Sequence, residues 1–165
     1  MTMIVTIREI CLDDDPAVCS VIKQVLVEFG VNRPGTAYFD ASLNNMTFSY
    51  SRPESVYFVA TSDGKIVGGA GIYPTQGLPK KTCELVKMYL LPEARGIGLG
   101  KALINKCTDF AKENGYKRIY LETLPELENA VFVYKSMGFE LLSKALGNSG
   151  HFACSIHMIK DIGDK

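Results

Sequence analysis

Glu93-Ala-Arg-Gly-Ile-Gly-Leu-Gly-Lys101 is the stretch that decides how this chain folds. It follows the mostly apolar run 85–91 and opens a helical pattern that continues to residue 114. A glycine turn between a strand and a helix leaves backbone N–H groups free to surround an anion, and the helix dipole adds partial positive charge. Arg95 and Lys101 add full charges. The stretch therefore predicts a phosphate-binding loop rather than a glycine turn without a ligand.

The spacing of the glycines argues against two better-known phosphate loops. A dinucleotide fingerprint that begins at Gly96 needs glycine at its sixth position, which is Lys101. A Walker loop that ends in Gly100-Lys101 needs a hydroxyl residue next, where the chain has Ala102. A nucleotide-phosphate binder of another class is disfavoured too, because no Ser, Thr or acidic residue is placed to hold magnesium.

The pattern that fits is Arg95-x-x-Gly98-x-Gly100 after a strand. It resembles the loop that holds the acetyl-CoA pyrophosphate in the GCN5-related N-acetyltransferases (GNAT). An overlapping register, Glu93-x-x-Gly96-x-Gly98, would place an acid where that family usually has Gln or Arg, so we take the register that begins at Arg95. The resemblance implies acetyl-CoA as the acetyl donor and no metal. The coenzyme contacts that it implies are Met88, Leu90, Leu91, Arg95, Gly96, Ile97, Gly98, Leu99, Gly100, Lys101, Asn129 and Tyr134.

The composition suits one domain over residues 1–165 with a single core. The 18 basic and 18 acidic side chains cancel, which argues against nucleic acid as the main partner. No apolar run approaches the ~20 residues of a membrane span, and charges from Arg8 onward come too early for a secretory signal. Five cysteines without a C-x-x-C pair favour reduced thiols in a cytoplasmic protein, and they do not make a zinc site with the two histidines.

Apolar periodicity and turn residues predict the element order β, α, α, β, β, β, α, β, α, β, β. Strands are expected at 4–12, 56–62, 65–73, 82–91, 118–123, 139–143 and 152–159, and helices at 13–29, 35–45, 98–114 and 125–137. This order predicts an α/β (α+β mixed) fold, with a mixed, mostly antiparallel central sheet of about seven strands and helices on both faces. It also matches the GNAT family. The resemblance covers nearly the whole chain, but its specific motifs lie within 84–140.

Tyr134 is the predicted general acid. It shares a helix face with Leu127 and Ala130 and precedes Gly138-Phe139, where the GNAT family has a tyrosine beside the coenzyme sulfur. A phenol with a pKa near ~10 can share a proton with a leaving thiolate whose thiol has a pKa near ~8.5. A core aromatic is the alternative. The two interpretations are compatible, because the ring can pack while the hydroxyl points at the sulfur.

A base is also required, because alkyl ammonium groups are mostly charged at neutral pH. Glu84 shares a strand face with apolar Val86 and Met88 if no bulge intervenes, and such neighbours would raise the pKa of its carboxyl. In the GNAT family a glutamate at this spacing before the end of the strand often acts as the base. An exposed glutamate is an equally supported interpretation. His151 in a glycine-rich loop is a second candidate base, although a capping or surface histidine is favoured there.

The resemblance also has a departure. An asparagine common in the GNAT family falls at Leu127, so Asn129 is the candidate substitute. In that family the backbone of 88–91 holds the pantetheine arm and the oxyanion. Cys154 is expected to pack, because the family transfers its acyl group without an acyl-cysteine.

The sequence thus predicts an acetyl-CoA-dependent N-acetyltransferase that uses a ternary complex. The expected acceptor is a small amine, an amino acid or a peptide N-terminus, in a pocket built by 30–53, 74–81 and 144–151. A non-catalytic acyl-CoA sensor is the alternative function. A homodimer through the last strands, as in many relatives, is left open.

Overall fold

The computed structural model describes residues 2–163, so residues 1, 164 and 165 of the predicted domain lie outside it. Seven strands form one sheet in the order β1-β2-β3-β4-β5-β7-β6. All neighbouring strands are antiparallel except β4 and β5. This confirms the predicted mixed, mostly antiparallel sheet. The strands are β1 (Val5–Glu9), β2 (Val56–Ser62), β3 (Lys65–Tyr73), β4 (Thr82–Leu90), β5 (Arg118–Thr123), β6 (Glu140–Leu142) and β7 (Ile156–Asp161).

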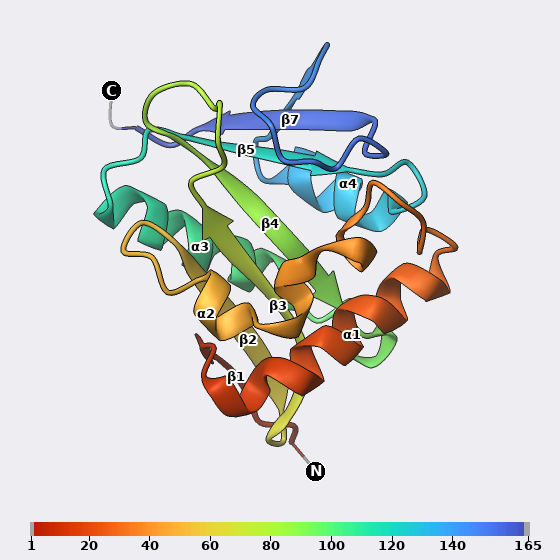
Figure 1. Cartoon of the computed structure of the whole chain (residues 1–165). Helices are drawn as coiled ribbons and strands as arrows, with labels where there is room; N and C mark the ends of the chain where they lie inside the picture. The colour runs from red at the N-terminus through yellow and green to blue at the C-terminus, as the bar shows by residue number, and fades with distance from the viewer. Residues whose placement is uncertain (1, 164–165) are drawn as a thin grey trace.

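Helices cover both faces of the sheet, as predicted. Figure 1 shows α1 (Asp15–Glu28) and α2 (Met46–Ser49) in front of the sheet and α3 (Leu99–Glu113) behind it. The fourth helix, α4 (Glu128–Ser136), follows β5. None of the helices within the described residues is long and apolar enough to cross a bilayer.

The two largest differences from the predicted elements lie in segment 35–45 and in the last strand. The segment 35–45, predicted to contain a helix, contains two short 3₁₀ turns instead, because Asp40 between them has an extended backbone with ψ of 128°. The last strand begins at Ile156 rather than at residue 152. The preceding loop leaves the sheet because the N–H of Ala153 donates to the carbonyl of Gly35 at 3.1 Å.

The two parallel strands separate soon after they begin. β4 pairs with β5 only from Thr82 to Glu84, opposite Arg118 to Tyr120. Figure 1 shows the two strands diverging from there, with α1 and the segment before α2 in front of the opening. The edge of β4 beyond Glu84 therefore faces a gap in the sheet rather than a neighbouring strand.

A bulge in β4 breaks the alternation that would have placed Glu84, Val86 and Met88 on one face. Gly69 pairs with Tyr89 while Gly71 pairs with Val86, so β4 has one extra residue there. Lys87 within the bulge has a φ of +50°. As a result, the strand presents Glu84 and Lys87 to one cleft and Leu90 to another.

Glycines in β3 allow an aromatic side chain to hold this bulge. The hydroxyl of Tyr57 on β2 donates to the carbonyl oxygen of Lys87 at 2.8 Å, which requires its ring to cross β3. A Cβ on Gly69 would lie 2.6 Å from that ring and 2.6 Å from the carbonyl oxygen of Phe58. Close backbone approach of this kind explains why glycine interrupts an otherwise apolar strand.

Candidate active site

A cleft of about 460 Å³ lies where the glycine loop, the end of β4 and α4 meet. Gly98 is the N-cap of α3 with a φ of +82°, a conformation that glycine adopts without strain. The first N–H groups of α3 have no partner within the helix and are available to an anion. The cleft is lined by Val25, Phe29, Met88, Tyr89, Leu90, Arg95, Gly96, Gly98, Leu99, Gly100, Lys101, Leu127, Asn129, Ala130, Phe132 and Val133.

Arg95 lies in this loop, but its charge is directed to α1. Its two terminal nitrogens bind the carboxylate of Glu28 at 2.8 Å each, and its Nε donates to the carbonyl of Leu90 at 3.0 Å. The guanidinium also lies over the ring of Phe29. Arg95 therefore holds the loop to α1. Lys101 also lines the cleft, and it forms no ion pair within residues 2–163. Sequence reasoning had no signal for the partner, which lies 67 positions away.

Most predicted coenzyme contacts line the cleft, but three do not. Leu91 is buried, and its N–H already donates to the carbonyl of Val67 at 2.8 Å. The side chain of Ile97 lines a separate small pocket beside β1. Tyr134 lines a narrow space next to the cleft instead. Asn129 does line the cleft. Sequence reasoning missed Phe132, which also lines it with 73% of its surface exposed.

A second cleft of about 790 Å³ is built by the segments predicted to hold the acceptor. Its polar floor includes Glu84 and Lys87 from β4 and His151 from the loop before β7. A narrow space of about 40 Å³ lies between the two clefts, since it shares Met88 and Tyr89 with the first and these three residues with the second. We call this space the passage, and residues of both β4 and β5 line it.

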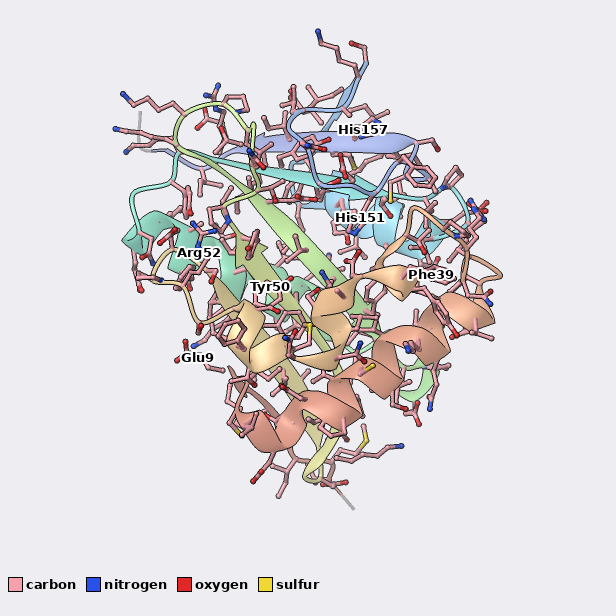
Figure 2. All side chains as sticks on the ribbon, in the orientation of Figure 1. Glu9, Phe39, Tyr50, Arg52, His151 and His157 are labelled. Carbon is pink, nitrogen blue, oxygen red and sulfur yellow. The ribbon has the colours of Figure 1, made fainter. Side chains whose placement is uncertain are left out.

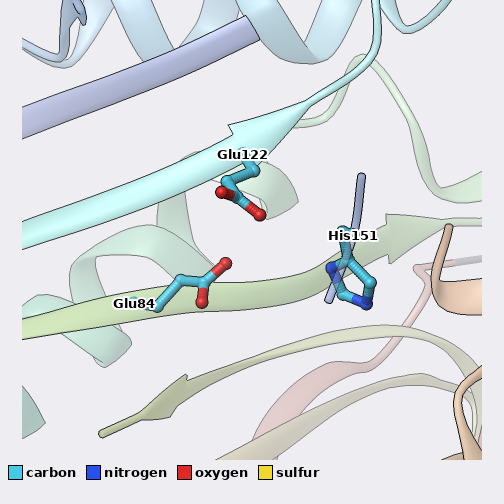
Figure 3. A group of neighbouring side chains, drawn as sticks. All are labelled: Glu84, Glu122 and His151. Atoms are coloured by element: carbon cyan, nitrogen blue, oxygen red, sulfur yellow. The ribbon is translucent and has the colours of Figure 1, made fainter. Parts of the chain in front are cut away.

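Three titratable side chains meet in this passage (Figure 3). Glu84 on β4, Glu122 on β5 and His151 each present one atom within 4.8 Å of the others. Glu84 is 3% exposed and accepts a hydrogen bond from Thr75 at 2.5 Å. Burial raises the pKa of Glu84 to about 7, and the nearby charge of Glu122 adds to the effect. Glu84 is thus buried rather than exposed, with a carboxyl group that titrates near neutrality.

Glu122 was not predicted as a site residue. Its carboxylate accepts hydrogen bonds from the hydroxyls of Tyr120, at 2.6 Å, and of Ser149. The ring of His157 stacks on Tyr120 and completes this support. The only sequence signal was a glutamate near the end of a buried strand, which does not reveal that β5 diverges from β4 at this point.

His151 is held by a half-buried network rather than exposed at the surface. Its Nε2 lies 2.8 Å from Asp40, which also accepts from the ammonium of Lys87 at 2.9 Å. Burial lowers the pKa of His151, but the hydrogen bond and charge of Asp40 outweigh it, so the net shift is upward. Because Nε2 is occupied, Nδ1 is the ring nitrogen left to face the passage.

Tyr134 lines the same passage from α4. Its ring packs edge-on against Phe139 at 5.9 Å, and the residue is 6% exposed. Burial raises the pKa of its hydroxyl, which keeps the proton on the oxygen at neutral pH. Within residues 2–163 no group hydrogen-bonds to this hydroxyl, so its proton is available to a ligand. Cys154 is nearby, and burial raises the pKa of its thiol to about 12, which does not favour a nucleophilic thiolate.

Comparisons with known proteins identify the class and then the family. A family model described as the acetyltransferase (GNAT) family matches residues 21–139. "Uncharacterized N-acetyltransferase YjgM" from Escherichia coli K12 is 40% identical over 156 residues, which cover 94% of this chain and 93% of the relative. These two matches define the class of the protein as acetyltransferase. The chain belongs to the GNAT family.

Solved structures show the same fold. A GNAT acetyltransferase from Staphylococcus aureus Mu50 matches with a TM-score of 0.85 and 21% identity, covering 97% of this chain and 100% of its own. The PaiA N-acetyltransferase of Thermoplasma acidophilum, solved in complex with coenzyme A, matches with a TM-score of 0.74 and 17% identity, covering 96% and 99%. At these identities the likeness concerns the fold alone.

Proposed function

We propose that this protein is an acetyl-CoA-dependent N-acetyltransferase that passes the acetyl group directly to an amine in a ternary complex. The observation that carries the proposal is the passage at Glu84 and Tyr134, because it lies between two clefts that could hold the donor and the acceptor. Membership of the GNAT family and the coenzyme A complex of PaiA support the choice of donor. Free thiols at all five cysteines suit the cytoplasmic location predicted from the sequence.

The first cleft would hold the coenzyme without a metal. Its pyrophosphate would accept hydrogen bonds from the amides of 96–101 at the start of α3, with Lys101 adding charge. The pantetheine arm would lie along Met88 and Leu90, beside the unpaired edge of β4. The thioester then reaches the passage, where Tyr134 lies.

The chemistry would proceed in three steps. Glu84 accepts a proton from the acceptor ammonium, and the free amine attacks the thioester carbonyl carbon. Main-chain N–H groups on the open edge of β4 stabilise the oxyanion of the tetrahedral intermediate. The C–S bond then breaks, and the leaving thiolate takes the proton of Tyr134. The excess proton on the former amine nitrogen passes through solvent to the tyrosinate, which leaves a neutral amide and a neutral Tyr134. A carboxyl with a pKa of about 7 suits a base at neutral pH.

A charge change in the glycine loop tests coenzyme binding. A Cβ at Gly100 would meet only the side-chain ends of Leu90, at 3.7 Å, and Met88, at 4.0 Å, so small side chains fit. Gly100→Asp should weaken acetyl-CoA binding about 10–100-fold in isothermal titration, because its carboxylate would repel the pyrophosphate. Gly100→Asn is the control of the same shape and should bind nearly as the wild type. Equal affinities for the two variants would rule out this loop as the pyrophosphate site.

Removal of one hydroxyl distinguishes an enzyme from a sensor. Tyr134→Phe should lower kcat about 10²-fold and leave acetyl-CoA binding unchanged, because only the proton for the thiolate is lost. The measurement is thiol release at saturating acceptor. Tyr38→Phe is the control, since Tyr38 lines neither cleft. This variant also loses only a hydroxyl, and its kcat should not change. An unchanged kcat would remove Tyr134 as the acid, and a wild type that binds acetyl-CoA without releasing thiol would favour the sensor.

A further inference from the structure

Charged side chains of both signs line the acceptor cleft. They are Asp40, Arg52, Glu84, Lys87 and His151. Asp40 already contacts two of the basic groups, Lys87 at 2.9 Å and His151 at 2.8 Å. Glu84 serves as the base in the proposed function. The contacts of the two permanent cations, Lys87 and Arg52, therefore decide whether the cleft can bind an anionic group on the acceptor.

Lys87 is a buried cation with donor capacity to spare. Its side chain is 7% exposed, and its ammonium binds Asp40 at 2.9 Å and the hydroxyl of Tyr50 at 3.3 Å. An ammonium has three N–H donors, and no third partner for it lies within residues 2–163. The ammonium and the Tyr50 hydroxyl both belong to the cleft wall. A buried donor of this kind favours an anionic ligand.

Arg52 supplies a second cation at the cleft. Its guanidinium lies over the ring of Tyr73, 5.8 Å from the centroid. Its Nη2 binds Glu54 at 2.7 Å, but both side chains are about half exposed, so this pair is weak and easily exchanged. Figure 2 shows Arg52 beside Tyr50, with His151 across from them. The planar guanidinium is suited to bind a carboxylate with two hydrogen bonds.

The sheet register places these cations close to the base. Tyr73 on β3 pairs directly with Glu84 on β4, and side chains of such pairs have Cβ atoms about 5 Å apart. Lys87 follows Glu84 by three residues on the same strand. An amine at Glu84 would therefore lie within the length of a small molecule from both Arg52 and Lys87.

We infer that the acceptor is an amino acid, whose free carboxylate binds to Arg52 and Lys87 while its amine lies at Glu84. The inference rests on the proposed function and makes its substrate class specific. A polyamine would bring a further cation toward Arg52 and Lys87. A plain amine or an amidated amino acid would leave the spare N–H donors of both cations unused.

The test compares matched acceptors by thiol release. The panel holds the twenty protein amino acids, their α-amides and the corresponding decarboxylated amines. For the best amino acid, kcat/KM should exceed that of its amide and its amine by at least about 10-fold. Amides or amines that react as well as the acids, or better, would overturn the inference while leaving the proposed function intact. Thiol release from none of the acceptors, with acetyl-CoA still bound, would overturn both.

Variants of Arg52 then test the binding residue. Arg52→Gln should raise KM for the amino acid about 10-fold and leave kcat/KM for its amide unchanged. Arg52→Lys keeps the charge and should recover part of the loss. Unchanged acetyl-CoA affinity shows that the variants are folded. An equal change for acid and amide would mean that Arg52 does not bind the carboxylate and would overturn its assignment.

Discussion

Replacing Glu84 by Gln should lower kcat about 10²–10⁴-fold, the range expected when a general base is removed. The amide keeps the shape of the side chain and can still accept the hydrogen bond from Thr75. It cannot take a proton from the acceptor. Steady-state thiol release at saturating acetyl-CoA and acceptor measures the effect. Glu113→Gln, on the exposed side of α3, is the matched control and should leave kcat unchanged.

The pH dependence gives this prediction a second readout. Glu84 must be ionised to act, so wild-type kcat/KM should rise with pH through an acid limb with a midpoint near its pKa of about 7. The Gln variant should lack this limb. If the Gln variant keeps the acid limb, the limb reports the pKa of His151 rather than that of Glu84. If its kcat equals that of the wild type, Glu84 is not the base.

The same pKa excludes unfolding as the reason for the lost activity. A carboxyl whose pKa is raised by folding holds its proton more tightly in the folded state, so stability is lost as pH rises from the unfolded pKa toward about 7. The side-chain amide of Gln does not ionise, so the variant has no such loss of stability. The variant should therefore unfold at no lower temperature than the wild type at pH 7.

Gly69→Ala should lower the free energy of unfolding by about 1–3 kcal/mol, the usual range for overpacking. The new Cβ would lie 2.6 Å from both the carbonyl oxygen of Phe58 and the ring of Tyr57, and backbone atoms cannot move aside easily. If Tyr57 shifts, its hydrogen bond to the carbonyl of Lys87 is lost and the bulge is released. The measurement is urea denaturation followed by circular dichroism.

Gly100→Ala is the control for this effect, because its Cβ meets no atom closer than 3.7 Å and the position is helical. Alanine there should be neutral or slightly stabilising. If the free energy of unfolding of Gly69→Ala stays within about 0.5 kcal/mol of the wild type, the effect is no larger than that of an ordinary surface substitution. The role assigned to the β3 glycines would then be wrong.

Local signals explain which elements could be predicted. β2, β3 and β5 match their predicted bounds to the residue, and the turn Asp63-Gly64 lies between the first two as expected. Their signals are short apolar runs and a turn with positive φ, which depend on near neighbours alone. The segment 35–45 failed because its conformation depends on Asp40, whose partners are Lys87 and His151.

The glycine loop could likewise be predicted only in part. Its backbone, with Gly96 and Gly98 at positive φ before α3, follows from the sequence. The direction of the Arg95 side chain does not, because Glu28 binds it from another helix. A phosphate loop could thus be predicted, whereas its source of positive charge could not.

The sequence by itself determined the order of helices and strands along the chain and the helix start that faces an anion, because backbone preferences act over a few neighbouring residues. Its motifs also indicated the family to which this chain belongs. Only the tertiary structure decided what the site residues can do. Separation of β4 from β5 opens the space between the two clefts, and burial moves the pKa of Glu84 to about 7. Lys87 and His151 meet at Asp40 from distant parts of the chain. Charge and proton affinity depend on burial and on such long-range partners, and no short stretch of sequence contains them.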